Sequence, residues 1–342
     1  MRITPLNLRH LVWSLAVIVV AAGCGGGEKN AQGVAEAPKD KVKIGFIVKK
    51  PDEPWFQLEW KFAGEAAQAD GFELITIGAT DGDKVLPAIE NVAAQGAQGL
   101  VICTPDVKLG PAIVARCAQR NLKLLTVDDQ LVGPDGKFLD VPHVGISAHK
   151  IGNNLGQALL DEMKKRGWKP EETGMIAVTF EELDTARERT DGAIETVVAG
   201  GFPESHVFKA PERGQDIADS RTAATPVLTQ HPEFKNWLIA SMNDAGAMGA
   251  VRATESFNIP AERVIGIGIN GDLALADLKK PTPNGLYGSI LLQAKRHGYD
   301  TSHMMFKWIT EGTAPPKITY TDGILITREN FKQVLADQGL PE

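Results

Sequence analysis

Short apolar runs alternate with longer stretches of mixed polarity from Val42 almost to the end of the chain. The runs occupy positions 42–48, 72–77, 100–103, 122–127, 144–147, 175–179, 206–209, 237–240, 264–269, 285–290 and 323–327. Nearly continuous apolar strands separated by helical stretches are typical of βαβ units, whose parallel sheets are covered by helices on both faces. The pattern therefore predicts an α/β protein.

The stretch after the first run has the clearest helical period. Phe56, Trp60, Ala63 and Ala67 recur at i, i+4, i+7 and i+11. Pro54 stands where proline favours the first turn of a helix. The spacing predicts an amphipathic helix that begins near Pro54.

A break near 143–150 separates two series of βα units. The chain has 342 residues, which is more than a single hydrophobic core usually organises. The pattern therefore predicts two doubly wound lobes of similar size. In such sheets ligands bind beyond the carboxyl ends of the strands.

Polar side chains gather where apolar runs of both halves end. The segments that follow these runs are Lys49–Phe56, Asp128–Gln130, Glu181–Arg189, Ser241–Asp244 and Asn270–Asp272. Carboxylate and amide oxygens accept hydrogen bonds from hydroxyl groups, and lysine, arginine and amide nitrogens donate to hydroxyl and ring oxygens. This chemistry fits a neutral polyol, with an aromatic ring to cover its C–H face. The alternative is ordinary solvated loops and helix caps, for which Asp184 and Asn243 are suited.

The N-terminal segment predicts export. Arg2 and Arg9 precede the mostly apolar stretch 11–22, which has the length of a signal-peptide core and is too short for an ordinary transmembrane helix. The small residues before Cys24 resemble a bacterial lipoprotein signal, which implies cleavage after residue 23, lipidation of Cys24 and anchoring to the outer side of the cell membrane. A plain secretory signal with an incidental cysteine is the alternative. The composition of positions 24–40, rich in Gly, Ala, Lys and Glu, predicts a flexible tether.

Composition and motif spacing argue against several other functions. The net charge of −7, without any arginine-rich stripe, opposes nucleic acid as a partner. Cys103 and Cys117 are expected to be buried free thiols, and neither they nor the scattered histidines have metal-ligand spacing. The motif Gly266–Gly271 has the letters of a dinucleotide fingerprint, but no carboxylate follows at the required distance. We therefore expect no cofactor and no metal.

The strand-end segments resemble the L-arabinose-binding family, within the ribose-type class of bacterial periplasmic sugar-binding proteins. The resemblance runs from Val42 to Leu340, and its motifs are highly specific together. They are Lys49–Phe62, Val101–Asp106, Val127–Gln130, Lys164–Trp168, Glu182–Arg187, Met242–Asp244 and Gly266–Gly271.

The resemblance implies the type 1 periplasmic binding-protein fold, in which two doubly wound parallel-sheet lobes are joined by a three-segment hinge and close over one sugar. The N-terminal lobe would comprise 41–146 plus about 293–322, and the C-terminal lobe 147–292 plus about 323–342. The sugar-binding residues that it implies are Lys49, Glu53, Trp55, Phe56, Cys103, Asp128, Asp129, Ile146, Thr185, Arg189, Met242, Asn243, Asn270 and Asp272.

Three positions depart from the family pattern. Leu273 stands where the family has an aspartate, with Asp272 one residue earlier; Ile146 replaces methionine and Leu292 replaces proline. The last two positions lie near the C5 substituent of the sugar in the family. A hydrophobic pocket discriminates one extra carbon group by only about 1–3 kcal/mol. Arabinose, galactose and fucose therefore stay open as ligands.

The function implied is that of a monomeric receptor, not an enzyme, which captures a monosaccharide outside the membrane and delivers it to the membrane subunits of an ABC importer. One alternative is an extracytoplasmic glycosidase, which needs two carboxyl groups across the scissile bond. Asp128 and Asp129 are adjacent, and neighbours in an extended strand point to opposite faces, which weakens that pairing but leaves Glu53 open as a partner. Another alternative is a sugar sensor that signals through a membrane partner.

Overall fold

A computed structural model describes residues 41–341 of the chain. The predicted signal peptide, the lipidation site at Cys24 and the tether lie outside the described residues and stay predictions. Within the described residues, no helix combines the length and the apolar character needed to cross a bilayer.

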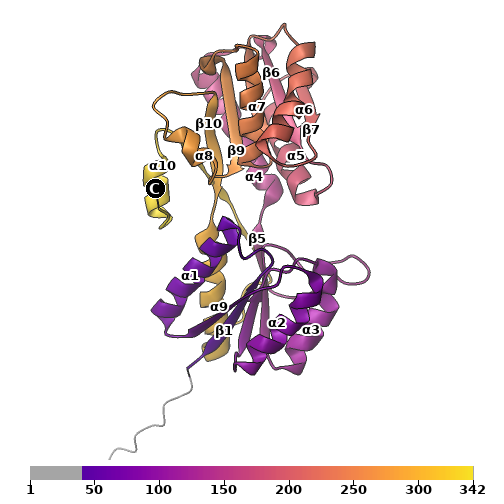
Figure 1. The fold of residues 1–342 in the computed structure, drawn as a ribbon, viewed down its shortest axis with the longest axis vertical. Helices are drawn as coiled ribbons and strands as arrows, with labels where there is room; N and C mark the ends of the chain where they lie inside the picture. Colours follow the sequence, from indigo (N-terminus) through magenta and orange to yellow (C-terminus); the bar gives the residue numbers. More distant parts are fainter. Residues whose placement is uncertain (1–40, 342) are drawn as a thin grey trace, which may run out of the picture. The chain divides into compact units, whose positions relative to one another are not determined.

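Two six-stranded sheets form the framework of the fold (Figure 1). The first sheet has the order β11-β5-β4-β3-β1-β2, and the second has the order β12-β10-β9-β8-β6-β7. The strands of the first sheet are β1 (Lys43–Val48), β2 (Glu73–Gly78), β3 (Gly99–Ile102), β4 (Lys123–Val127), β5 (His143–Ile146) and β11 (Ile318–Thr321). The strands of the second are β6 (Thr173–Thr179), β7 (Val207–Pro211), β8 (Asn236–Ser241), β9 (Val264–Asn270), β10 (Leu286–Leu292) and β12 (Gly323–Thr327).

Every apolar run of the sequence coincides with a strand, and between residues 41 and 341 all strand pairs except one are parallel. The exception is β12, which runs antiparallel to β10. Strand β11 is an addition that the sequence pattern did not predict. Ile318 and Tyr320 on this edge strand are about half exposed, at 47% and 52%, so β11 has no continuous apolar run to reveal it.

Helices cover both faces of each sheet. Around the first sheet lie α1 (Pro54–Asp70), α2 (Gly82–Ala94), α3 (Gly110–Gln119) and α9 (Thr301–Glu311). Around the second lie α4 (Ala148–Lys165), α5 (Asp184–Ala199), α6 (Ile217–Gln230), α7 (Asp244–Ser256), α8 (Ala274–Leu278) and α10 (Phe331–Asp337). In the first sheet, α2 and α3 cover one face and α1 and α9 the other (Figure 1), each face with its own buried apolar cluster. The predicted α/β class is confirmed.

Helix α1 begins at Pro54, as predicted. Its buried side chains include Phe56, Glu59 and Ala63, spaced three and four residues apart. Trp60 is only half-buried. The buried face of this helix therefore carries a carboxyl group among apolar neighbours, a feature that the apolar period alone does not reveal.

The chain passes between the two sheets three times. The crossings follow β5 at Ser147, follow β10 at Gln293, and join β11 to β12 at Asp322. The Ser147 amide donates to the Thr321 carbonyl at 3.2 Å, and Gln293 Nε2 donates to the Asp322 carbonyl at 2.6 Å. The crossing segments are thus hydrogen-bonded to one another, and the fold is the predicted two-lobed one with a three-segment hinge. The exact lobe bounds stay a prediction.

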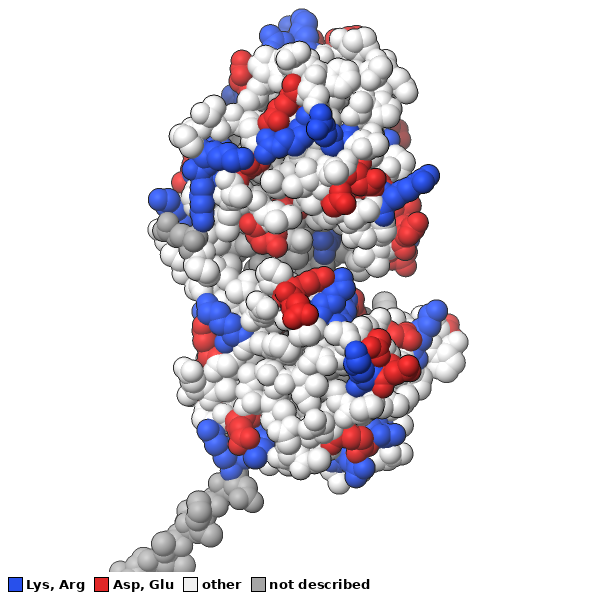
Figure 2. Space-filling view, in the orientation of Figure 1, with Lys and Arg blue, Asp and Glu red and all other residues white. Residues whose placement is uncertain are grey.

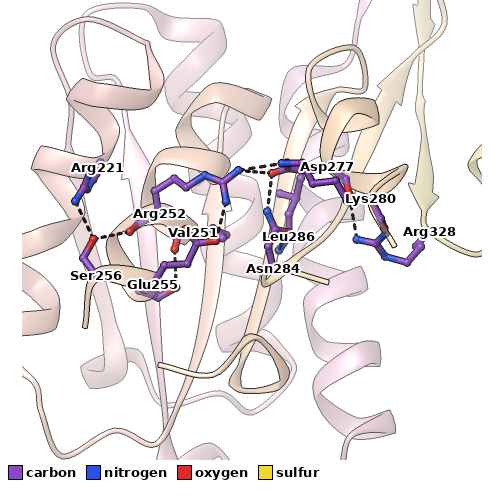
Figure 3. A network of polar contacts seen from close by, with 11 residues as sticks. Arg221, Val251, Arg252, Glu255, Ser256, Asp277, Lys280, Asn284, Leu286 and Arg328 are labelled. Atoms are coloured by element: carbon purple, nitrogen blue, oxygen red, sulfur yellow. Dashed lines mark hydrogen bonds and ion pairs between the residues drawn. The ribbon is translucent and has the colours of Figure 1, made fainter. Parts of the chain in front are cut away.

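A polar network around Asp277 holds one flank of the second sheet together (Figure 3). Asp277 is 1% exposed and accepts from Arg252 of α7 at 2.9 Å and from Asn284 at 2.7 Å, with Lys280 as a further partner. Because Asn284 stands just before β10, the network ties α7 and α8 to the start of that strand.

Charged side chains of both signs are interspersed on the face shown in Figure 2. Many form ion pairs between near neighbours in the sequence, such as Lys50 with Glu53 at 2.9 Å and Arg187 with Asp184 at 2.7 Å. Exposed pairs of this kind each contribute about 0–1 kcal/mol, so they add little to the stability of the folded state.

Candidate functional site

Three neighbouring strands of the first sheet end in polar side chains that meet. Strand β1 is followed by Lys49, β3 by Cys103, and β4 by Asp128 and Asp129. The strands are parallel and adjacent, so these ends share one edge of the sheet. Lys49 Nζ forms an ion pair with Asp129 Oδ2, and Cys103 Sγ lies 3.4 Å from the same oxygen. Although burial favours the neutral amine, Cys103 and the two carboxylates raise the pKa of Lys49 above its usual range.

Asp128 has a left-handed backbone, with φ of 62°. Such a conformation is costly for a residue other than glycine and is found mainly where function or packing requires it. Strand β4 ends at Val127, so the alternation of an extended strand does not continue through Asp128 and Asp129. Both residues line the same cavity, but their carboxylates have different partners: Asp129 contacts Lys49, and Asp128 contacts Trp55 and His297.

The Asp128 carboxylate has two ring partners. Trp55 Nε1 donates to Asp128 Oδ2 at 3.3 Å, and His297 Nδ1 lies 2.7 Å from Asp128 Oδ1. Burial alone would raise the pKa of Asp128, but the hydrogen bond and electrostatic attraction of His297, helped by Lys49, hold this pKa below its usual value. Asp128 is therefore an ionised acceptor.

Glu59 of α1 lies beside this pair and is fully buried. Burial and the neighbouring Asp128 raise the pKa of Glu59 well above its usual value, so this side chain keeps its proton to higher pH than an exposed glutamate does. Among residues 41–341, only Glu59, Asp128 and His297 have three ligand atoms close enough together to hold a metal ion. The 2.7 Å between His297 and Asp128 is a hydrogen-bond distance, so the cluster is explained without a metal.

In the second sheet, β8 is followed by Met242 and Asn243. Asn243 caps helix α7, as its residue type suggested, because its Oδ1 accepts from the Gly246 amide at 2.7 Å. Asn243 Nδ2 donates to the Gln215 carbonyl at 3.4 Å, and its second N–H is the donor that Asn243 can offer to a ligand. Asp184 is not a cap: it lies inside the first turn of α5, and Leu183 holds the N-cap position.

Strand β9 ends in a turn held by a buried carboxylate. Asn270 has φ of 114° and is followed by Gly271 with φ of 89°. Asp244 accepts from the amides of Gly271 at 3.1 Å and Ala274 at 3.0 Å, and also from the Ser289 hydroxyl. Burial raises the pKa of Asp244 to about 7. Asp244 therefore positions Asn270 through the backbone rather than by touching its side chain.

Helix α5 supplies Thr185 and Arg189. Arg189 Nη1 donates to the Met242 carbonyl at 2.9 Å, which fixes the guanidinium against the end of β8. Its buried Nε has no hydrogen-bond partner among the described residues. Burial lowers the pKa of Arg189 to about 10, which leaves the group charged at neutral pH. The guanidinium is therefore a fixed cation with an unused donor.

One cavity of about 450 Å³ brings these strand ends together. All the predicted binding residues except one line it, from both sheets: Lys49, Glu53, Trp55, Phe56, Asp128, Asp129, Ile146, Thr185, Arg189, Met242, Asn243, Asn270 and Asp272. The exception is Cys103, which is fully buried behind Asp129 and does not line the cavity. The thiol can act on a ligand only through Asp129. Cys103 and Cys117 are both buried free thiols, as predicted.

Several residues near the cavity were not predicted. Gln215, Leu183 and Ala294 line it, and the C-terminal residues Leu340 and Pro341 reach it from beyond α10. Gln215 has φ of 58° in the loop before α6, a left-handed conformation that no local sequence motif predicts. Glu59 and His297 stand behind the lining. The sequence does contain an indication for Glu59. Its helical spacing places it on the same face as the apolar residues Phe56 and Ala63, so the side chain is expected to be buried with them.

The arrangement suits a small uncharged ligand with many hydroxyl groups. Fixed cations at Lys49 and Arg189 donate, carboxylates at Asp128 and Asp129 accept, and Trp55 adds an aromatic wall. The volume falls in the range of small-molecule sites. Of the carboxylates that line the cavity, Glu53 is paired with Lys50, Asp129 with Lys49, and Asp128 with the rings of Trp55 and His297. Within residues 41–341, the lining therefore contains no two carboxylates that both lack a cation and a hydrogen-bonding ring.

The sequence of the chain is similar to those of known periplasmic binding proteins. The family model of periplasmic binding proteins and the sugar-binding domain of the LacI family matches residues 41–334. The chain is 47% identical to the ABC transporter L-arabinose-binding periplasmic protein of Azospirillum brasilense, over 97% of this chain and 98% of the relative. It is 49% identical to the L-arabinose-binding periplasmic protein of Escherichia coli (strain K12), over 89% of this chain and 93% of the relative.

A solved structure supports the fold. The periplasmic ribose ABC transporter protein of Conexibacter woesei superimposes with a TM-score of 0.72 at 19% identity, over 86% of this chain and 95% of that one. At this identity the likeness concerns the architecture alone. The family match covers nearly all the described residues. The chain therefore belongs to the family of periplasmic binding proteins and LacI-type sugar-binding domains.

Proposed function

We propose that this protein is an extracytoplasmic receptor that captures one monosaccharide, L-arabinose foremost, and delivers it to an ABC importer. The observation that carries the proposal is the convergence of charged donors, charged acceptors and an aromatic wall from both sheets on one cavity of about 450 Å³. The two relatives that match over most of their length are both named for L-arabinose binding, which supports this choice of sugar.

The sugar would be held from two sides. The first sheet offers Lys49, Asp128 and Asp129, and the second offers Arg189 and Asn243. Each hydrogen bond to a charged group contributes roughly 1.5–3 kcal/mol net, so a handful can give ~8 kcal/mol, a micromolar complex, after the ordering costs. Since neither side alone offers the full set, the sugar favours the conformation in which both sides reach it.

Sugar selectivity would depend on the apolar part of the lining. Ile146 ends β5 and Leu292 ends β10, and both line the cavity. Their volumes decide whether the cavity accommodates the C5 substituent of D-galactose or D-fucose, which L-arabinose lacks. Discrimination of about 1–3 kcal/mol is expected from such contacts. L-Arabinose is therefore the preferred ligand, with the two hexoses as the weaker alternatives.

The receptor would act outside the cytoplasmic membrane as a monomer. The proposed lipid on Cys24 would tether it to the membrane through positions 24–40, and the importer's membrane subunits would be its protein partner. No chemical step is assigned to the site, since its charged groups are arranged to hold hydroxyl groups.

The test is titration calorimetry of the mature protein with L-arabinose, D-galactose and D-fucose. Arg189→Ala should weaken L-arabinose binding about 10- to 100-fold, the equivalent of one charged hydrogen bond. Asn243→Asp should weaken it similarly, because the variant keeps the capping oxygen and loses the Nδ2 donor. Arg187→Ala is the matched control, since Arg187 lies on the same helix and is paired with Asp184.

Unchanged affinity in both Arg189→Ala and Asn243→Asp would reject the site. A protein that binds no monosaccharide, or that releases sugar from an oligosaccharide, would reject the proposed function.

A further inference from the structure

His297 lies in an unusual backbone segment directly after a crossing between the sheets. Residues Arg296–Asp300 form a π-helical turn, η5, that leads into α9. Such turns are rare and are found often at functional sites. Gly298 allows this turn to approach α1 closely, because a Cβ there would collide with the carbonyl of Glu59. The turn holds the His297 ring in the interior, with 0% exposure.

The ring joins two of the predicted sugar-binding residues. His297 Nδ1 lies 2.7 Å from Asp128 Oδ1. The same ring packs edge-on against Trp55, with centroids 5.1 Å apart, and Trp55 itself donates to Asp128. The left-handed backbone of Asp128 gives its side chain a direction that packing must maintain. His297 is the buried group placed to maintain it.

The other ring nitrogen reaches the hinge. His297 Nε2 lies 2.8 Å from Thr321 Oγ1, at the end of β11. Thr321 Oγ1 donates to the Gly145 carbonyl at 3.3 Å, and the Thr321 carbonyl accepts from the Ser147 amide. One side chain therefore connects the Asp128 carboxylate to two of the three segments that cross between the sheets.

The charged and titratable surroundings of the ring come from several elements. Those that face the Asp128–His297 pair are Lys49, Glu59, Cys103, Asp129 and His143. Glu59 Oε1 is 3.7 Å from His297 Nδ1, beyond hydrogen-bond distance. Asp128 is therefore the direct partner of Nδ1, and Thr321 is the partner of Nε2. The two ring nitrogens thus have separate partners, and substitutions that retain only one of them can test each contact.

We infer that His297 is a positioning residue for sugar binding, which holds the Asp128 carboxylate and the Trp55 ring in place and ties both to the hinge strand β11 through Thr321. The inference rests on the proposed function. It predicts that the Asp128-facing nitrogen governs sugar affinity, whereas a purely space-filling role would make the two nitrogens equivalent.

Two pairs of substitutions separate these roles. In His297→Asn the side-chain amide nitrogen takes the place of Nδ1, and in His297→Gln it takes the place of Nε2. Calorimetry with L-arabinose should show affinity within about fivefold of the unmodified protein for His297→Asn, and a loss of about 10- to 100-fold for His297→Gln. Thr321→Val should weaken binding several-fold, and Thr321→Ser, which restores the hydroxyl, should not.

His303→Gln is the control, since His303 of α9 makes a similar histidine–carboxylate contact with Asp70 at 2.7 Å and does not line the cavity. Its sugar affinity should be unchanged. If His297→Asn and His297→Gln lose affinity equally, or neither loses it, the inference is wrong while sugar binding by the unmodified protein stands. If neither variant at 297 folds, equal affinities of Thr321→Val and Thr321→Ser overturn it. A lack of binding of any monosaccharide by the unmodified protein overturns the proposed function, and this inference with it.

Discussion

Replacing Asp244 with asparagine should remove a pH dependence of stability that the wild-type chain carries. Burial raises the pKa of Asp244 from 3.8 to about 7 in the folded protein. The folded state therefore keeps its proton where the unfolded chain has lost it. This contribution to stability is fully present below pH 3.8 and is lost as the pH rises through 7.

The structure sets the size of the effect. A difference of roughly three pKa units at about 1.4 kcal/mol each corresponds to about 4 kcal/mol, lost between pH 4 and pH 8. The asparagine oxygen can still accept from the amides of Gly271 and Ala274, and its amide group can donate to Ser289. Asp244→Asn should therefore fold, hold the Asn270 turn and become more stable than wild type as the pH rises.

The assay is urea unfolding followed by far-UV circular dichroism at several pH values between 4 and 8. The quantity to plot is the free energy of unfolding of Asp244→Asn minus that of wild type, which should rise across this range. Asp277→Asn is the control: although burial opposes it, Lys280, Asn284 and Arg252 hold the pKa of Asp277 below its usual value of 3.8, so the difference curve of this variant should stay nearly flat between pH 4 and pH 8. Its contribution is lost only as the pH falls. A flat difference curve for Asp244→Asn would refute the reasoning.

Three further substitutions test other parts of the structure. Glu59→Gln copies the protonated form of the side chain, so calorimetry should show sugar affinity within a few-fold of wild type, and a tenfold loss of affinity would contradict this. Because burial raises the pKa of Glu59, the free energy of unfolding of the variant in urea should increase relative to that of wild type as the pH rises above 4.5. Lys49→Met removes the cation paired with Asp129 and should weaken sugar binding about 10- to 100-fold by calorimetry; unchanged affinity would exclude Lys49 as a donor. Asp277→Ala leaves Arg252 without its buried partner and should cost about 2–3 kcal/mol in urea unfolding at unchanged sugar affinity; a matching loss of affinity would place this network in the binding site.

The sequence was sufficient for most of the fold because parallel strands buried on both faces are almost wholly apolar. Such runs stand out from the amphipathic helices between them. The same rule failed for β11, an edge strand with Ile318 and Tyr320 half exposed, whose identity depends on pairing with β5. The antiparallel direction of β12 could not be predicted either, because the path of the chain decides the direction in which a strand pairs.

The cavity lining was largely predictable because adjacent parallel strands must end at a common edge. What could not be predicted is the support behind it. His297 is far from Asp128 in the sequence, and only the packing of η5 on α1 brings the two side chains together. The direction of Asp128 also depends on a backbone conformation at φ of 62°, which no rule of strand alternation anticipates.

Strands β11 and β12 have a consequence for biosynthesis. They are neighbours in the chain, within 318–327, yet one completes the first sheet and the other the second. In β11, Ile318 pairs with His143, so the ribosome must make most of the polypeptide before either edge can be filled. Closing such long loops slows folding. Both sheets of a growing polypeptide therefore stay incomplete until β11 and β12 have been synthesised.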